Sequence, residues 1–324
     1  MDKPKVIVIC GPTASGKTGL SIELAKKIDG EIISADSMQI YKEMDIGTAK
    51  VTKKEMQGIK HYLINIVSPD ERYSVADFKK DAEKAIEEIL SKNKVPILVG
   101  GTGLYIDSVI NGIEYNEIHT DLKYREELEN IAKKDGLENL YNMALKIDKK
   151  ATEKISINDK KRIFRVLEIY KSTGKTKTEL EIESRKKEPK YSFYVFGTEL
   201  ARDKLYEKIN LRVDKMIEDG LINEVEKIIK KYNNFPTAMQ GLGYKEIKEY
   251  LDGKCSKEEA IEKIKMETRR YAKRQITWFK RNKNIIWLNM EKQDTIKNNL
   301  ETILEVIRWK QKMLKKLQRK YVLL

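Results

Sequence analysis

The chain has 324 residues, of which 40% are apolar, enough for a core in one large domain or two of ordinary size. It contains no run of about 18 apolar residues, which excludes a transmembrane helix. We expect no signal peptide, since the first strand pattern begins near the N-terminus. A net charge of +14 indicates a polyanionic partner, unless it only reflects a Lys-rich composition.

Cysteine and histidine are too sparse for a structural metal site. Cys10 and Cys255 have no metal-ligand spacing, and His61 and His119 are isolated, so we expect no zinc. Cys10 ends an apolar run and is expected to be a buried structural thiol. This usage is typical of a reducing compartment, and we expect a cytoplasmic protein.

The first 110 residues alternate between strand and helix patterns, which predicts a parallel α/β sheet. Ligands of such sheets bind at the carboxyl ends of the strands. We expect strands over residues 6–10, 31–35, 61–67 and 96–99, and helices over residues 16–28 and 77–91.

Strand patterns disappear between residues 115 and 190, where charged helical patterns predict a helical insertion. We therefore expect an α/β fold with a P-loop NTPase-like parallel sheet core and a helical insertion domain. Its parts are residues 1–114, the insertion 115–190, a return to the core over 191–290, and a basic tail over 291–324. In the insertion we expect helices over 122–134, 137–145 and 159–170, then a polar, mobile connection over 172–190. After it we expect strands over 191–196 and 284–288, and helices over 202–218, 222–232 and 257–281.

A phosphate-binding loop follows the first predicted strand. Residues 11–18 read GPTASGKT, match G-x-x-x-x-G-K-[ST], and precede a helix pattern. In this setting backbone N–H groups and the helix N-terminus cradle a phosphate, Lys17 adds a cation, and Thr18 can hold Mg²⁺. The alternative is a glycine-rich turn that only joins strand to helix. The motif indicates a phosphate without saying which molecule carries it.

Two further strand ends carry polar side chains. Asp36 follows the second predicted strand, where a carboxylate can hold Mg²⁺ through water, act as a general base, or simply cap the next turn. Gly100, Gly101, Thr102 and Gly103 follow the strand over residues 96–99. These glycines allow close backbone approach and Thr102 offers a hydroxyl, or Thr102 is only a helix N-cap.

Basic residues gather on two predicted helices. Residues 269–283 hold seven Lys or Arg and no acid, with Arg270, Arg274 and Arg281 at helical spacing and aromatic residues between them. Arg162 and Arg165 share a helix face in the insertion. Charge interleaved with aromatic rings suits RNA phosphates and bases, and the alternative is a basic surface helix.

Several segments, taken in order, resemble the tRNA dimethylallyltransferase (tRNA isopentenyltransferase) family. The resemblance spans residues 6 to about 289. It implies transfer of a dimethylallyl group from dimethylallyl diphosphate to N6 of the adenosine 3′-adjacent to the anticodon. The segments are GPTASGKT, SADSMQIYKEMDIGTAK (34–50), YSVADFKKDA (73–82), LVGGTGLY (98–105), AMQGLGYKE (238–246) and TRRYAKRQITWF (268–279).

The resemblance assigns roles to individual residues. Asp36 matches the general base, Thr102 the threonine near the reacting centre, Lys17 a catalytic cation, and Arg212 a group that helps neutralise diphosphate. The target base must leave the anticodon-loop stack to reach them. The diphosphate cradle comprises Gly11, Pro12, Thr13, Ala14, Ser15, Gly16, Lys17 and Thr18, with Mg²⁺ at Thr18.

By the same resemblance, four segments would contact the tRNA anticodon stem-loop, and the protein is expected to act as a monomer. The family pattern does not account for residues 308–320, which hold seven basic residues and no acid. This tail is either a helix packed on the core or a source of extra tRNA affinity. The tRNA-binding residues implied are Asp36, Ser37, Met38, Gln39, Lys161, Arg162, Ile163, Phe164, Arg165, Gln240, Gly241, Gly243, Tyr244, Lys245, Arg270, Arg274 and Gln275.

Three other functions stay open. A P-loop kinase of a small metabolite would use the same loop and Asp36 but would need neither the basic helix nor the insertion. An adenylate prenyltransferase would act on free nucleotide. A non-enzymatic tRNA-binding protein would have no use for Lys17 and Asp36 at strand ends.

Overall fold

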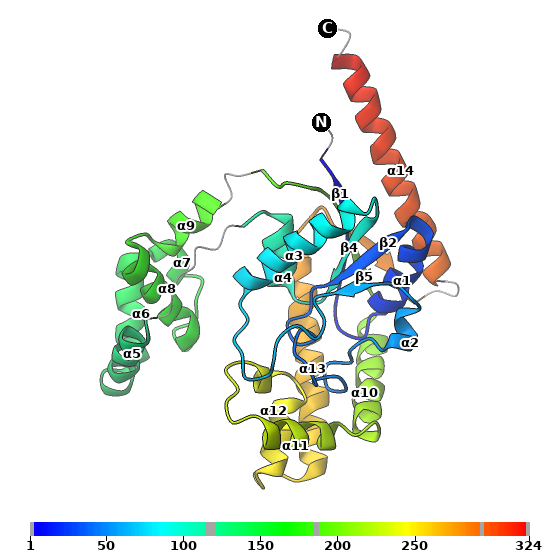
Figure 1. Ribbon diagram of the computed structural model, residues 1–324. Helices are drawn as coiled ribbons and strands as arrows, with labels where there is room; N and C mark the ends of the chain where they lie inside the picture. The colour runs from blue at the N-terminus through cyan, green and yellow to red at the C-terminus, as the bar shows by residue number, and fades with distance from the viewer. Residues whose placement is uncertain (1–2, 114–120, 185–187, 292–294, 322–324) are drawn as a thin grey trace. The chain divides into compact units, whose positions relative to one another are not determined.

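The computed structural model describes residues 3–113, 121–184, 188–291 and 295–321, and for residues 309–321 only the course of the helix. The chain divides into two compact units. The larger unit comprises residues 1–109 and 190–324, and the helical unit comprises residues 110–189. Every strand of the sheet lies in the larger unit (Figure 1).

The described strands form a 6-stranded parallel sheet in the order β3-β2-β4-β1-β5-β6. Ile9 is in register with Val99 on one side and Phe196 on the other, so the carboxyl ends of the three central strands meet at one edge. Their continuous apolar runs are typical of strands buried on both faces. The bounds are β1 (Lys5–Cys10), β2 (Gly30–Ser34), β3 (His61–Tyr62), β4 (Val95–Gly100), β5 (Ser192–Glu199) and β6 (Ile286–Asn289).

Helices of the larger unit pack against the sheet. One core cluster packs Leu20 and Leu24 of α1, with Leu300 and Ile303 of α14, against strand residues such as Ile9. The first part of α14, up to Ile307, therefore packs on the core, whereas the side chains of residues 309–320 lie outside the described part of the chain. The helices are α1 (Lys17–Ile28), α2 (Lys53–Met56), α3 (Val75–Ser91), α4 (Gly103–Ile110), α10 (Arg202–Glu218), α11 (Leu221–Lys231), α12 (Tyr244–Leu251), α13 (Lys257–Phe279) and α14 (Thr295–Tyr321), with the short 3₁₀ helix η1 (Ala238–Gln240).

The helical unit is built from amphipathic helices around its own core, as the sequence predicts. Leu128, Leu140 and Leu167 meet in this core. Its helices are α5 (Leu122–Lys134), α6 (Gly136–Ile147), α7 (Lys149–Thr152), α8 (Lys160–Thr173) and α9 (Lys177–Ser184).

Two sequence expectations are wrong. The strand expected over residues 61–67 ends at Tyr62, because Leu63 and Asn65 have left-handed backbones with φ of 59° and 58°. The polar connection expected over residues 172–190 contains helix α9. Its start is held by Glu179, whose carboxylate accepts the backbone N–H of Thr176 at 2.7 Å. Residues 185–187 lie outside the described part of the chain.

Candidate active site at the carboxyl edge of the sheet

A cavity of about 480 Å³ opens at the carboxyl edge of the sheet, within the size range of small-molecule sites. Segments far apart in the sequence meet there. Most predicted site residues of the larger unit line it, while Gly11, Pro12, Thr102, Gly243, Lys245 and Arg270 lie outside its lining. The predicted residues that line it are Thr13, Ala14, Ser15, Gly16, Lys17, Thr18, Asp36, Ser37, Met38, Gln39, Arg212, Gln240, Gly241, Tyr244, Arg274 and Gln275.

The phosphate loop (residues 11–18) is tightly built. Gly11 has φ 148°, and a Cβ there would come 2.2 Å from Thr198 Oγ1 on β5. Ser15 Oγ donates to Pro12 O at 2.8 Å, and Lys17 Nζ donates to the same carbonyl at 2.6 Å. Gly16, which precedes α1, supplies no side-chain cap. The amino end of α1 is therefore left for an anion.

Two cations meet at this loop. Arg212 reaches it from α10, where its Nη1 donates to Thr13 Oγ1 at 3.2 Å. The pKa of Lys17 is lowered to about 8, chiefly by burial and also by the nearby Arg212, while Asp36 opposes the shift. Burial also lowers the pKa of Arg212. Two desolvated cations side by side favour an anionic ligand, which would relieve their repulsion.

Asp36 has one carboxylate oxygen in a turn and a second one available. Its Oδ1 accepts the backbone N–H groups of Met38 at 2.9 Å and Gln39 at 3.3 Å, which confirms that Asp36 caps the next turn. Oδ2 has no hydrogen-bond partner among the described residues. Because Asp36 also lines the cavity, capping does not prevent chemistry at the other oxygen.

Thr102 links two strand-end loops. Its Oγ1 accepts the backbone N–H of Ser37 at 3.0 Å and donates to Ser37 Oγ at 3.3 Å. At Gly100 a Cβ would come 2.1 Å from the carbonyl oxygen of Ala35, so the close approach expected of these glycines is to protein backbone. Thr102 thus holds the segment that carries Asp36.

Gln275, which was expected to contact tRNA, is hydrogen-bonded to backbone through both polar atoms of its amide. It is 5% exposed. Its Oε1 accepts the backbone N–H of Thr13 at 2.9 Å and its Nε2 donates to the carbonyl oxygen of Gly101 at 2.8 Å. Both ends of the amide are taken by backbone, so Gln275 bridges the phosphate loop and the turn after β4.

Three other residues that were expected to contact tRNA have buried side chains. Ile163 and Phe164 are 0% and 1% exposed because they face the core of the helical unit. Tyr244 is 0% exposed, and its hydroxyl donates to Glu224 at 2.5 Å. These side chains support structure instead of presenting a surface to RNA.

The basic residues that were expected to contact tRNA are exposed. Lys161, Arg162 and Arg165 form the exposed face of α8, beside the buried Ile163 and Phe164. In the larger unit Gln240, Lys245, Arg270 and Arg274 are exposed, while Gly241 and Gly243 are buried backbone positions. Arg270 pairs with Glu267 at 2.6 Å, and the Arg274 guanidinium lies 5.7 Å from the ring centre of Tyr271.

Sequence reasoning missed Lys50 and Glu224. Lys50 is buried and donates to three oxygens, and Glu224 on α11 accepts from the backbone of residues 45–47. A charged residue in a polar segment is typical of a solvated surface, so the sequence carried no signal of these contacts.

Cys10 is a buried thiol, as expected. Burial raises its pKa to about 12. The described residues hold no group of three or more His, Cys, Asp or Glu side chains able to bind a metal ion. Among the helices that the structure describes, none is both long and apolar enough to cross a membrane.

Comparisons with known proteins identify the family of the chain. The model of the IPP transferase family matches residues 39–282. A tRNA dimethylallyltransferase of Acetivibrio thermocellus is 54% identical over 291 residues, which are 90% of this chain and 93% of the relative. Another, of Carboxydothermus hydrogenoformans, is 50% identical over 303 residues, 94% of this chain and 96% of the relative.

Solved structures agree as well. The full-length tRNA isopentenylpyrophosphate transferase of Bacillus halodurans is 42% identical, with a TM-score of 0.73 over 97% of this chain and 100% of the other. A eukaryotic dimethylallyltransferase acting on tRNA is 33% identical, with a TM-score of 0.74 over 89% of this chain and 74% of the other. The chain therefore belongs to the IPP transferase family, which confirms the resemblance seen in its motifs.

Proposed function

We propose that this protein transfers a dimethylallyl group from dimethylallyl diphosphate to N6 of the adenosine 3′-adjacent to the anticodon in tRNA, releasing diphosphate. The observation that carries the proposal is that residues of the phosphate loop and Asp36 line the same cavity. The relatives' names supply the identity of the transferred group and of the acceptor.

The phosphate loop binds the diphosphate of the donor. Backbone N–H groups at the amino end of α1, with Lys17 and Arg212, surround a site for its negative charge. The negative charge on the bridging oxygen grows as the bond between it and C1 of the donor breaks. The same cations then stabilise the departing diphosphate.

Asp36 accepts the proton of the acceptor. The exocyclic amine of adenine is a poor nucleophile because its lone pair is delocalised into the ring. As N6 forms its bond to C1 of the dimethylallyl group, one N–H proton passes to Asp36 Oδ2, the oxygen that the turn leaves available. Thr102, which holds Ser37, keeps this carboxylate close to the reacting centre.

Mg²⁺ fits the site as a partner of the donor. Thr18 is exposed and lines the cavity next to Lys17, so its hydroxyl would hold the ion, with diphosphate oxygens and water as the other ligands. When bound, the ion neutralises charge on the leaving diphosphate.

The anticodon stem-loop binds to the exposed basic residues of both units. Arg270, Arg274 and Lys245 present charge in the larger unit, and Lys161, Arg162 and Arg165 do so on α8. Their contacts to phosphates position the loop, while the target adenosine leaves the stack to enter the cavity. We further propose that the protein acts as a monomer in the cytoplasm.

Incubation with dimethylallyl diphosphate, Mg²⁺ and unmodified tRNA, followed by nucleoside mass analysis, tests the proposal. We expect a dimethylallyl-adenosine product from tRNA, none from AMP, and no phosphoryl transfer from ATP. An equal yield from AMP would favour the free-nucleotide prenyltransferase, and ATP-dependent phosphorylation would favour a kinase. The Lys17→Ala variant is the matched control for donor binding.

A further inference from the structure

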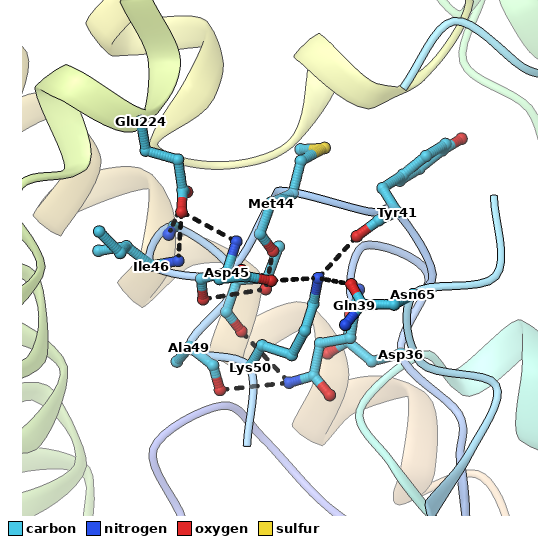
Figure 2. Close-up of polar contacts among 12 residues, drawn as sticks. Asp36, Gln39, Tyr41, Met44, Asp45, Ile46, Ala49, Lys50, Asn65 and Glu224 are labelled. Carbon is cyan, nitrogen blue, oxygen red and sulfur yellow. Dashed lines mark hydrogen bonds and ion pairs between the residues drawn. The ribbon is translucent and has the colours of Figure 1, made fainter. Parts of the chain in front are cut away.

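A buried lysine organises the loop that follows Asp36. Lys50, whose side chain is 3% exposed, donates to the carbonyl oxygen of Tyr41 at 2.6 Å, Asp45 Oδ1 at 2.7 Å and Asn65 Oδ1 at 2.6 Å (Figure 2). These bonds use all the donors of its ammonium group. Lys50 therefore fixes both ends of the segment between residues 41 and 50 and joins it to Asn65.

A carboxylate from a distant helix holds the tip of the same loop. Glu224 on α11 accepts three consecutive backbone N–H groups, from Asp45 at 3.0 Å, Ile46 at 2.8 Å and Gly47 at 3.1 Å (Figure 2). The hydroxyl of Tyr244 donates to it as a fourth partner. At Gly47 a Cβ would lie 2.5 Å from the Tyr244 ring, so the loop also packs tightly on this tyrosine.

The clamped loop is connected to Asp36 through Gln39. Gln39 Nε2 donates to the carbonyl oxygens of Thr48 at 3.3 Å and Ala49 at 3.4 Å. The backbone N–H of the same Gln39 donates to Asp36 Oδ1. Figure 2 shows Gln39 between Ala49 and Asp36. A displacement of residues 45–49 would therefore move the residue that orients the Asp36 carboxylate.

We propose that Glu224 and Lys50 are positioning residues that hold the 36–50 loop, through Gln39, so that Asp36 Oδ2 meets the amine of the acceptor. Neither residue lines the cavity, so neither is expected to touch donor or acceptor. The inference rests on the proposed function for its catalytic consequence, but its structural half, the clamping of the loop, can be measured without any substrate.

The Glu224→Gln variant tests the clamp with little change of shape. It removes the charge and turns an amide N–H₂ group toward the backbone donors, which leaves part of the loop unsatisfied. Glu226→Gln is the matched control: it lies on the same helix, its side chain is 45% exposed, and it pairs with Lys230. We expect hydrogen exchange of residues 45–47 to accelerate in Glu224→Gln and to stay unchanged in Glu226→Gln.

Steady-state kinetics then test the link to Asp36. In Glu224→Gln, kcat should fall about 10- to 100-fold, the loss typical of a reacting group misplaced by about 1 Å, while KM for dimethylallyl diphosphate stays within about twofold. In an Asp36→Asn background the same substitution should change kcat less than about threefold, because a carboxylate that is absent cannot be misplaced.

The outcomes separate the possibilities. Unchanged exchange in residues 45–47, unchanged kcat, or a full additional loss in the Asp36→Asn background would each overturn the inference. Inactivity of the wild-type protein on tRNA would refute the proposed function alone, since the exchange result stands by itself. Should Glu224→Gln fail to fold, Tyr244→Phe removes a single donor to Glu224. We then expect the same change in exchange and a loss of about two- to tenfold in kcat.

Discussion

Replacement of Gln275 by Leu should destabilise the larger unit and weaken donor binding at the same time. Leu has a similar volume but cannot make the hydrogen bonds of the amide. The backbone N–H of Thr13 and the carbonyl oxygen of Gly101 would both stay buried without a partner. An unsatisfied buried group costs about 1–3 kcal/mol, so for two groups we expect a loss of about 2–6 kcal/mol in the free energy of unfolding.

Urea unfolding followed by tryptophan fluorescence measures this loss in the larger unit. All the tryptophans of the chain, Trp278, Trp287 and Trp309, belong to that unit. Lys273→Ala, an exposed position on the same helix, is the control and should change stability by less than about 0.5 kcal/mol.

The variant Gln275→Glu distinguishes the two bonds of the amide. Glu keeps an acceptor for Thr13 but places a carboxylate oxygen against the carbonyl of Gly101, so the phosphate loop should retain more of its order than in Gln275→Leu. We expect KM for dimethylallyl diphosphate to rise most in the Leu variant. A loss of less than about 1 kcal/mol in Gln275→Leu, with unchanged KM, would refute the bridge as a source of stability and order.

The other predictions concern charge. Asp36→Ala should lower the rate constant of transfer in single-turnover assays by about 10²–10⁴-fold, while tRNA affinity stays unchanged. A retained rate would show that Asp36 is not the base. Calorimetry should show that inorganic diphosphate binds the protein more weakly above a pH of about 8, because Lys17 loses its charge there. Lys17→Arg should abolish this dependence on pH. Without an anion, the unfolded chain holds more protons than the folded one between pH about 8 and 10.5, so Lys17 should make the free energy of unfolding rise with pH there. In the double variant Arg270→Ala, Arg274→Ala, the slope of log K for tRNA binding against log salt concentration should become shallower by about one unit per lost contact. An unchanged slope would show that neither arginine contacts tRNA.

The sequence predicted the core of the fold because its signals are local. Apolar runs such as residues 6–10 and 96–99 read as buried strands, and the loop between strand and helix places Lys17 without further knowledge. The failure at residues 61–67 has an equally local cause, since the left-handed backbones of Leu63 and Asn65 interrupt a run whose composition suits a strand. Composition alone does not reveal that conformation.

Residue roles on helices were harder to predict, because a contiguous segment does not face one way. Residues 161–165 were expected to contact tRNA together, yet the period of 3.6 residues divides them. Lys161, Arg162 and Arg165 lie outward, and Ile163 and Phe164 lie inward. The same division separates Gln275, which faces the phosphate loop, from Arg274, which is exposed.

Contacts between segments far apart in the chain could not be predicted from the sequence, and they position the loops that line the cavity. Lys17, Asp36 and Thr102 come from strand ends in residues 1–109, whereas Arg212, Glu224 and Gln275 come from helices in residues 190–324. Each of the latter contacts a loop that carries one of the former or lies beside it. The strands bring these three side chains to one edge of the sheet. Their orientation depends on helices that follow the insertion in the chain. Substitutions in α10, α11 and α13 should therefore change catalysis even where no substrate touches them.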